Sequence, residues 1–259
     1  MALAFRTHEL DALFRTKYGE PEQTGPRPRR RYGFGYFLPD DHYEALVDSL
    51  VSPSTRWLDV GGGRHLFPAN PKLAEQLSRR CLHLAGVDPS PNILENPFVA
   101  ERVQSVVQDY AAREPFDLLT LRMVAEHIAE PAGAMEAFRR LLKPGGTLVI
   151  YTINKWSPVS ILAWLTPFRM HHPVKKIAWQ TEEQDTFPIA YRMNTRRTLA
   201  KLAEAHGFRE TAFRRLDDLS TFAGFRLLNY AELLAWRAFR TIGLTYPENC
   251  LLGVYERLA

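Results

Sequence analysis

Three consecutive glycines and two carboxylates are the residues of this sequence best suited to bind a ligand. The run Trp57-Leu58-Asp59-Val60-Gly61-Gly62-Gly63 ends one apolar segment, and Asp88 ends the next. Glycines at the carboxyl end of a parallel strand let the backbone approach a ligand where side chains would block it. An acid at the end of the second strand can accept both hydroxyls of a ribose, and Asp59 can face an ammonium group. The pattern predicts a ligand with a ribose and an amino-acid tail.

Two common nucleotide-binding loops do not match this glycine run. A dinucleotide loop has a third glycine at the position where Leu66 stands. A phosphate-binding P-loop would continue with Gly-Lys-Ser or Gly-Lys-Thr, and neither follows. The loop therefore favours a ligand that needs no phosphate site.

Short apolar runs alternate with helical patterns in the first half of the chain. The expected strands are Arg56–Val60, Leu82–Val87, Val103–Val107, Phe116–Leu121 and Thr147–Ile153. The expected helices are Asp40–Val51, Pro71–Arg80 and Pro131–Leu142, and the last one stops at Lys143-Pro144-Gly145-Gly146. Strands that alternate with helices and are apolar almost throughout predict an α/β fold, in which helices cover both faces of a parallel sheet.

The alternation is interrupted at three places. Residues 1–35 lack a clear period, and their basic run Gly25–Gly33 predicts an exposed N-terminal arm or loop. Contact of that run with nucleic acid or an anionic substrate is the alternative to a solvated loop. Residues 154–193 and 217–248 are irregular insertions in a single domain that spans residues 36–259. The other expected elements are a helix capped by Asn194-Thr195 and strands at Phe208–Leu216 and Cys250–Tyr255.

The composition is that of an ordinary globular protein. Of the 259 residues, 46% are hydrophobic and 24% are charged, and a net charge of +4 is too small to argue for a nucleic-acid partner. Cys81 and Cys250 stand in no metal-ligand or disulfide-scaffold spacing, which favours a reducing compartment. The uncharged stretch Trp156–Phe168 is shorter than the ~20 residues of a membrane-spanning helix. We therefore expect a soluble cytoplasmic protein without stable membrane insertion.

Several short motifs follow one another in a fixed order along the chain. They are Asp59-x-Gly61-x-Gly63, Asp88, Gln108-Asp109, Phe116-Asp117-Leu118, Glu126-His127, Leu142–Leu148 and Tyr151–Asn154. In this order they resemble the class I S-adenosylmethionine-dependent methyltransferases, although His65 replaces the usual third glycine of the first motif. The resemblance covers residues 40–155 well and residues 194–259 more loosely. It implies a Rossmann-like, mostly parallel seven-stranded sheet, S-adenosyl-L-methionine as cofactor, and a lid inserted after the fifth strand.

The resemblance also implies roles for individual residues. Cofactor contacts are implied for Asp59, Gly61, Gly62, Gly63, Asp88, Pro89, Gln108, Asp109, Arg122 and Met123. His127, with Glu126, follows the fourth strand, where the family places its acceptor, so His127 is the expected general base; packing or capping of the next loop is the alternative. Glu126-His127 is also similar to the ubiquinone-biosynthesis O-methyltransferases, but Met123 stands where their pattern has an acid. We therefore expect no metal site.

A small-molecule acceptor is expected to meet the insertions, which would form a lid over it. The candidate contacts are Trp156, His171, His172, Tyr191 and Arg192, with Trp164 and Trp179 in the apolar part of the lid. Adjacent histidines point in different directions, so a structural role for His171-His172 is the alternative. Tyr191-Arg192 either contacts the acceptor or anchors the lid.

The expected activity is transfer of a methyl group from S-adenosylmethionine to a hydroxyl, or an amine, of a small molecule in secondary metabolism. Such a displacement requires alignment of nucleophile, methyl and sulfur, and a general base helps when the acceptor is a hydroxyl. A non-catalytic S-adenosylmethionine-binding or scaffold protein is the alternative that His65 keeps open, and an NAD-dependent oxidoreductase is the third. The apolar stretches Trp156–Phe168 and Phe222–Phe239 leave a homodimer or membrane contact open, beside ordinary buried packing.

Overall fold

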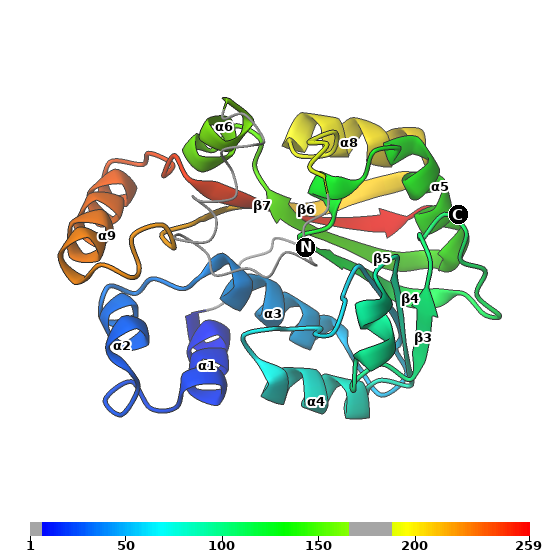
Figure 1. The fold of residues 1–259 in the computed structure, drawn as a ribbon, viewed down its shortest axis with the longest axis horizontal. Helices are drawn as coiled ribbons and strands as arrows, with labels where there is room; N and C mark the ends of the chain where they lie inside the picture. The colour runs from blue at the N-terminus through cyan, green and yellow to red at the C-terminus, as the bar shows by residue number, and fades with distance from the viewer. Residues whose placement is uncertain (1–6, 166–187) are drawn as a thin grey trace.

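A seven-stranded sheet forms the centre of the molecule (Figure 1), which is a computed structural model that describes residues 7–165 and 188–259. The strands are β1 (Arg56–Val60), β2 (His83–Asp88), β3 (Glu101–Gln104), β4 (Phe116–Arg122), β5 (Leu142–Ile153), β6 (Phe208–Asp217) and β7 (Asn249–Arg257). Their order is β3-β2-β1-β4-β5-β7-β6. Only β7 runs antiparallel to its neighbours β5 and β6, so the expected mostly parallel, Rossmann-like sheet is confirmed.

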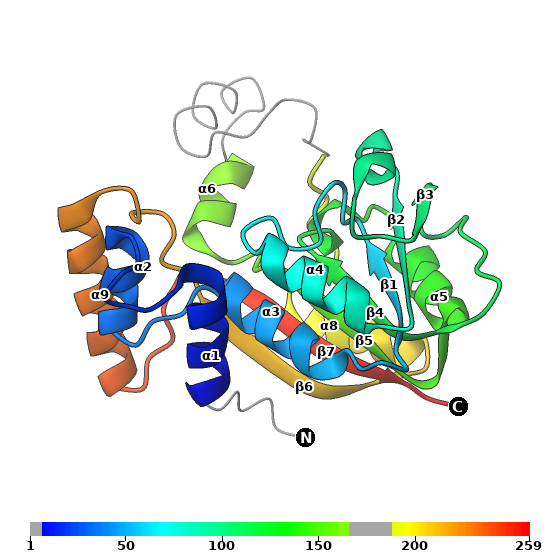
Figure 2. The ribbon, with the colours of Figure 1, turned by 90° about the horizontal axis from the view of Figure 1, so that it is seen from below.

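Helices cover both faces of this sheet, as expected. They are α1 (Thr7–Tyr18), α2 (Pro26–Gly33), α3 (Pro39–Leu50), α4 (Pro71–Arg80), α5 (Pro131–Leu141), α6 (Pro158–Leu165), α8 (Arg196–Ala205) and α9 (Arg226–Thr241), with short 3-10 turns η1 (Pro91–Glu95) and η2 (Ala125–His127). α3 and α4 lie on one face and α5 and α8 on the other (Figures 1 and 2). None of the helices in the described ranges is long and apolar enough to cross a membrane.

Successive strand residues alternate between two cores. Trp57 in β1 and Tyr151 in β5 belong to the core under α1, α3 and α4, whereas Leu58 and Ile150 belong to the core under α5 and α8. Both faces of the central strands are therefore buried, which explains why these strands are apolar almost throughout. The same alternation places Asp59 on the Trp57 side of the sheet.

Most predicted elements lie within two residues of the observed ones, and two strands differ. β3 spans Glu101–Gln104 instead of Val103–Val107, and this edge strand has only one neighbour to set its pairing. β5 begins at Leu142 and runs through the Pro144-Gly145-Gly146 segment that we expected to be a loop, and its register on β4 shifts between Phe116 and Leu118. The cap of α8 is confirmed, since Thr195 Oγ1 accepts a hydrogen bond of 3.1 Å from Thr198 N.

The basic run near the N-terminus is helical. The expectation that Gly25–Gly33 forms an irregular arm is wrong, because Pro26–Gly33 forms α2 and Thr7–Tyr18 forms α1. Both prolines of α2 stand in its first turn, where the missing N–H is not needed. In α1, Leu10, Leu13 and Phe14 are buried at helical spacing in the core shared with α3 and α4. The division of the chain at residue 35 stays a prediction.

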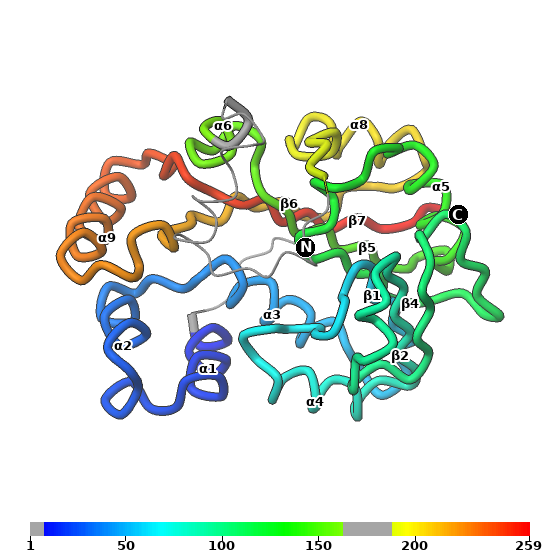
Figure 3. The backbone as a smooth tube through the Cα atoms, in the orientation of Figure 1, coloured from blue at the N-terminus to red at the C-terminus, as the bar shows by residue number. Residues whose placement is uncertain are grey.

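The carboxyl ends of the strands meet at one edge of the sheet. Ile153 at the end of β5 pairs with Cys250, and Asp217 at the end of β6 pairs with Asn249. The chain therefore leaves β5 toward α6, and leaves β6 toward α9, at the same end of the molecule (Figure 3). Ligands of open parallel sheets bind beyond this edge.

A buried ion cluster fixes α1 on α3. Lys17 Nζ lies 3.0 Å from Asp41 Oδ1 and 2.8 Å from Glu44 Oε1, and all three side chains are buried. Burial lowers the pKa of Lys17, but the charges of Asp41 and Glu44 outweigh burial and raise the pKa above its ordinary value. The ammonium group is therefore the main charge partner of two buried carboxylates.

We predict that Lys17→Met lowers the free energy of unfolding by about 3 kcal/mol, because Glu44 loses its counter-charge and Asp41 keeps only Arg31, at 3.3 Å. The measurement is urea unfolding at neutral pH. Lys72→Met, on the exposed side of α4, is the matched control and should change stability by less than ~0.5 kcal/mol. Equal stability of the two variants would show that α1 is not held by this cluster.

Candidate active site

The glycine loop after β1 has a backbone that only glycine adopts readily. Gly61 and Gly63 have φ values of +75° and +48°. A Cβ on Gly61 would overlap the side chain of Val124 after β4, and a Cβ on Gly62 would overlap the carboxylate of Asp59. The loop therefore lies closely between the ends of β1 and β4.

Asp59 lies under this loop in a fully buried position. Its Oδ1 accepts a hydrogen bond of 2.7 Å from Thr120 Oγ1, which in turn accepts one of 2.8 Å from Trp57 Nε1. Burial raises the pKa of Asp59 to about 7, and the charge of Asp88 adds to the rise, while the Thr120 bond and Arg122 oppose it. A cation near this carboxylate would be stabilised strongly, because no solvent competes for it.

Asp88 connects the end of β2 to the same loop. Its Oδ2 accepts a bond of 3.0 Å from Gly63 N, and its Oδ1 accepts one of 2.7 Å from Ser90 N. A carboxylate has about four lone-pair sites and can accept several hydrogen bonds at once. Pro89, the next residue, is exposed.

The end of β4 contributes the next part of the site. Arg122 Nη2 forms an ion pair of 3.0 Å with Asp40 Oδ2 at the start of α3. Met123 has a φ of +53°, and its N–H donates to Tyr151 O at 2.8 Å. A non-glycine residue with positive φ is uncommon and marks a backbone held by its surroundings.

Glu126 is a second buried carboxylate at this edge. Its Oε2 accepts a bond of 2.6 Å from Thr152 Oγ1, and Thr152 accepts one of 2.8 Å from Asn194 Nδ2. Burial raises the pKa of Glu126 above its ordinary value. The backbone oxygen of Glu126 also accepts bonds of 2.7 Å from Ala190 N and 3.1 Å from Tyr191 N. The last residues of the 154–193 insertion, and Asn194 after it, are therefore held at Glu126 and Thr152.

His127, the next residue, is half-buried. Its Nδ1 lies 3.1 Å from the carbonyl oxygen of Pro188. A carbonyl can only accept, so the neutral imidazole carries its proton on Nδ1 and its lone pair on Nε2. This tautomer presents Nε2 as the atom that can take a proton.

The remaining predicted residues differ in how exposed they are. Gln108 is half-buried near Gly133 of α5, and Asp109 is exposed. Trp156 is 66% exposed, with Lys155 Nζ 5.7 Å from its ring centre.

The Tyr191-Arg192 segment is tied to residues 126–129. Tyr191 contacts Glu126 through its backbone and has a φ of +51°, whereas Arg192 binds Ala129 O at 2.8 Å, which favours an anchoring role for this segment. His171, His172 and Trp179 lie outside the described residues, as does the side chain of Trp164.

Three polar residues that support the site were not predicted from the sequence. They are Thr120, Thr152 and Asn194, which hold the carboxyl groups of Asp59 and Glu126 directly or through one bond. Thr120 and Thr152 are fully buried polar residues within otherwise apolar strands. That pattern was visible in the sequence, because a hydroxyl in a buried strand needs a hydrogen-bond partner.

Residues 26–212 match the protein family described as methyltransferase domain. The chain belongs to this family. The ubiquinone biosynthesis O-methyltransferase of Xanthomonas campestris pv. campestris (strain B100) is 34% identical to this methyltransferase domain over 125 residues, which are 44% of the chain and 49% of that protein. The match thus spans about half the length of this curated relative.

Two solved structures share the fold of this methyltransferase domain. A Listeria monocytogenes protein named as an S-adenosylmethionine-dependent methyltransferase has a TM-score of 0.53 and 13% identity, over 85% of this chain and 99% of that chain. The geranyl diphosphate C-methyltransferase of Streptomyces coelicolor A3(2) has a TM-score of 0.51 and 14% identity, over 83% and 75%. At these identities the likeness shows the fold alone.

The described ranges 7–165 and 188–259 hold no group of three or more side chains that could bind a metal ion. The expectation that the site uses no metal stays a prediction.

The buried position of Asp59 predicts how the free energy of unfolding depends on pH. Its pKa is about 7 in the folded chain and about 3.9 in the unfolded chain, so the folded state loses stability as pH rises from 4 to 7. Above pH 7 the folded chain carries the full free-energy cost of burying the ionised Asp59 carboxylate. Asp59→Asn removes this cost and keeps the acceptor for Thr120, so we predict that it raises the free energy of unfolding at pH 8 by up to about 4 kcal/mol.

Denaturant unfolding at pH 4.5 and pH 8 checks this prediction. The gain should fall to about 1 kcal/mol at the lower pH, and the exposed Asp109→Asn should show no gain at either pH. A variant less stable than the unmodified chain at pH 8 would contradict a buried, charge-disfavouring environment for Asp59.

Proposed function

We propose that this chain is an S-adenosylmethionine-dependent methyltransferase that methylates a hydroxyl of a small molecule. The observation that carries the proposal is the buried Asp59 carboxylate under a three-glycine loop, next to Asp88 at the end of β2. A cationic amino-acid tail and a ribose are complementary to these two groups. Phosphates are not, because an anionic pyrophosphate at this loop would face Asp59. This argues against the dinucleotide alternative.

The residues present fit the cofactor. A Cβ on Gly61 or Gly62 would overlap Val124 or Asp59, so the Asp59 carboxylate lies directly against the backbone of the glycine loop. Asp59 would hold the ammonium group, and Asp88 the ribose hydroxyls. When bound, S-adenosylmethionine supplies a methyl group on a positively charged sulfur, which becomes a neutral thioether when the methyl leaves.

The acceptor side of the site is proposed at Glu126-His127. A hydroxyl must lose its proton as it attacks, and a base within hydrogen-bond reach contributes roughly 10²–10⁴-fold to the rate. The bond between His127 Nδ1 and Pro188 O supports this role, because a proton on Nδ1 makes Nε2 the ring atom that can take another proton. Glu126, held by Thr152, fixes the turn that carries His127 and adds negative charge nearby when ionised.

The choice of a hydroxyl rests on the relative from Xanthomonas, which is named as an O-methyltransferase of ubiquinone biosynthesis. An amine is the second acceptor class. Four further points remain part of this proposal. They are a small-molecule role in secondary metabolism, a cytoplasmic location, a homodimer, and a lid formed by residues 154–193 and 217–248. Cofactor binding without turnover on any acceptor would favour the scaffold alternative.

Asp88→Ala is predicted to weaken S-adenosylhomocysteine binding at least about tenfold, because charged hydrogen bonds to the ribose contribute about 1.5–3 kcal/mol each. Isothermal titration calorimetry measures the affinity. His65→Gly is the matched control in the same loop; the His65 side chain is exposed, so affinity should stay within about threefold. Unchanged affinity in Asp88→Ala would remove Asp88 from the site, and a large loss in His65→Gly would make that histidine a contact.

His127→Ala and His127→Gln separate a proton-accepting role from a structural one. Glutamine can still donate a hydrogen bond to Pro188 O but cannot take a proton, so we predict that both variants lower kcat by about 10²-fold or more. Formation of S-adenosylhomocysteine from S-adenosylmethionine is followed with a panel of phenols and catechols. Affinity for S-adenosylhomocysteine should not change. Full activity of His127→Gln would show that the histidine only supports the loop.

A further inference from the structure

α2 and α9 lie side by side at one end of the molecule (Figures 1 and 2). Arg30 of α2 donates a bond of 3.0 Å to Arg226 O of α9, and its guanidinium lies 5.1 Å from the ring centre of Tyr230. Phe34 packs edge-on against the same ring at 6.2 Å. These two helices, with residues 222–225 and 242–244 beside α9, are called the α2–α9 face below.

α9 exposes several large apolar side chains, and two of its four buried side chains are polar. Its buried side chains are Asn229, Glu232, Leu233 and Trp236. The opposite side carries Leu227, Ala231, Leu234 and Ala238, at the i, i+4, i+7 and i+11 spacing of one helix stripe. Leu227 is 82% exposed and Leu234 is 59% exposed. An amphipathic helix whose apolar stripe faces outward requires a partner for that stripe.

The apolar surface continues beyond both ends of α9. Phe225 before the helix is 65% exposed, and Ile242 after it is 70% exposed. The one acid within α9 is the buried Glu232, which accepts hydrogen bonds from Asn229 and Tyr246. Within the described residues the outward side of α9 therefore combines large apolar side chains with arginines and carries no negative charge.

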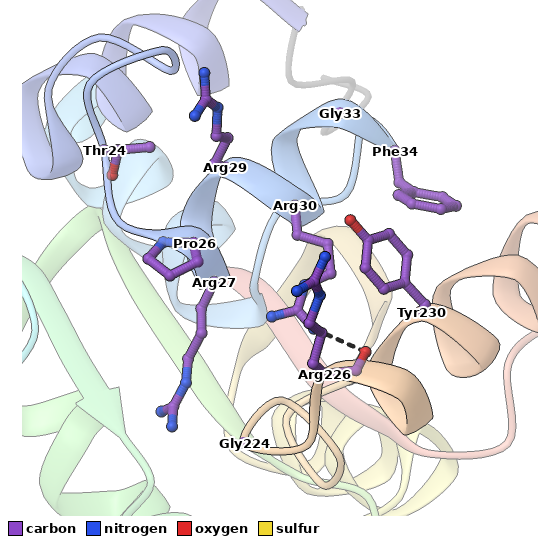
Figure 4. Close-up of a pocket in the computed structure, with 10 residues that line it drawn as sticks. All are labelled: Thr24, Pro26, Arg27, Arg29, Arg30, Gly33, Phe34, Gly224, Arg226 and Tyr230. Atoms are coloured by element: carbon purple, nitrogen blue, oxygen red, sulfur yellow. Dashed lines mark hydrogen bonds between the residues drawn. The ribbon is translucent and has the colours of Figure 1, made fainter.

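A basic cavity of about 940 Å³ opens between the two helices. Its lining includes Arg27, Arg29, Arg30 and Arg226 and no carboxylate (Figure 4). Figure 4 shows the side chains of Arg30 and Arg226 next to each other. None of the four arginines forms an ion pair with a carboxylate in residues 7–165 or 188–259. The guanidinium groups of these four arginines repel one another, and a bound anion would reduce that repulsion.

Positive charge is concentrated in these two helices. Together α2 and α9 contain seven arginines and one glutamate, so their net charge exceeds the +4 of the whole chain. We propose that the α2–α9 face binds the anionic surface of a lipid bilayer. The leucine stripe of α9 lies in the headgroup boundary, and the arginines contact lipid phosphate groups. This combination of an apolar stripe and a basic rim is the pattern of helices that lie in a membrane interface.

Two other partners fit the surface less well. A second copy of the chain, docked through a two-fold axis, would bring the same arginines of both copies together, with no acid on this face to pair with them. A nucleic acid would match the arginines but would leave the leucine stripe exposed, since phosphate contacts come from polar groups. The anionic bilayer satisfies both features.

Vesicle flotation with the full chain tests the proposal. The probes are vesicles of phosphatidylcholine alone and vesicles with about one third phosphatidylglycerol. We expect binding to the anionic vesicles to exceed binding to the neutral ones at least about tenfold and to fall with added salt. Arg27→Glu with Arg226→Glu, and separately Leu227→Ser with Leu234→Ser, should each lower the partition coefficient at least about tenfold.

Matched substitutions elsewhere serve as controls. Arg197→Glu with Lys201→Glu on α8 reverses the same number of charges, and Leu82→Ser changes a leucine that is 63% exposed. Both should bind like the unmodified chain, and thermal melting confirms that every variant is folded. Equal binding to neutral and anionic vesicles, or equal losses in the controls, would overturn the proposal.

Two other outcomes would overturn it in favour of another partner. One is a dimer seen by sedimentation without lipid and abolished by Leu227→Ser with Leu234→Ser, which would assign the face to a second copy. The other is binding to DNA or RNA without binding to vesicles. No arm of this experiment depends on methyl transfer, so its failure leaves the proposed function untouched.

Discussion

The carboxylate of Asp59 lies directly under Gly62, where no side chain has room. Thr120 and Trp57 hold that carboxylate from within the sheet, and Gly61 above it touches Val124 at the end of β4. Burying an ionisable group without a counter-charge costs free energy, and the raised pKa of Asp59 expresses this cost. A buried carboxylate kept at the carboxyl edge of the sheet despite this cost indicates a binding site for a cation.

The two halves of the site are built differently. The glycine loop, Asp59 and Asp88 are placed by adjacent parallel strands, so their geometry follows from sheet register. Glu126 is placed by hydrogen bonds from Thr152 on β5 and from the backbone of Ala190 and Tyr191, far along the chain. The first half is set by neighbouring strands of the sheet, whereas the second depends on hydrogen bonds between segments far apart in the chain. The acceptor is therefore harder to identify than the cofactor.

The sequence predicts the parts of the fold that local signals define, and it does not predict the parts that depend on contacts between distant segments. β1 and α4 are predicted to the residue, because an apolar run or an amphipathic period bounded by proline is a local signal. The length of β5 is not predicted, since its first residues pair with β4 through a register shift that only the neighbouring strand defines. α2 is missed because prolines and arginines outweigh the rest of its eight residues, although both prolines stand where a helix accepts them. Thr120 and Thr152 stand out in the sequence as hydroxyls within apolar strands, but the carboxylates that they hold lie far along the chain and cannot be assigned to them locally.

The central claim is that the Asp59–Gly62 arrangement and Asp88 hold a ribose and a cationic amino-acid tail. A crystal structure of the full chain grown with S-adenosylhomocysteine tests it most directly. We expect the ammonium group beside Asp59 and both ribose hydroxyls within hydrogen-bond distance of Asp88. Electron density for the ligand away from the glycine loop, or a chain that binds NADH there instead, would contradict the account.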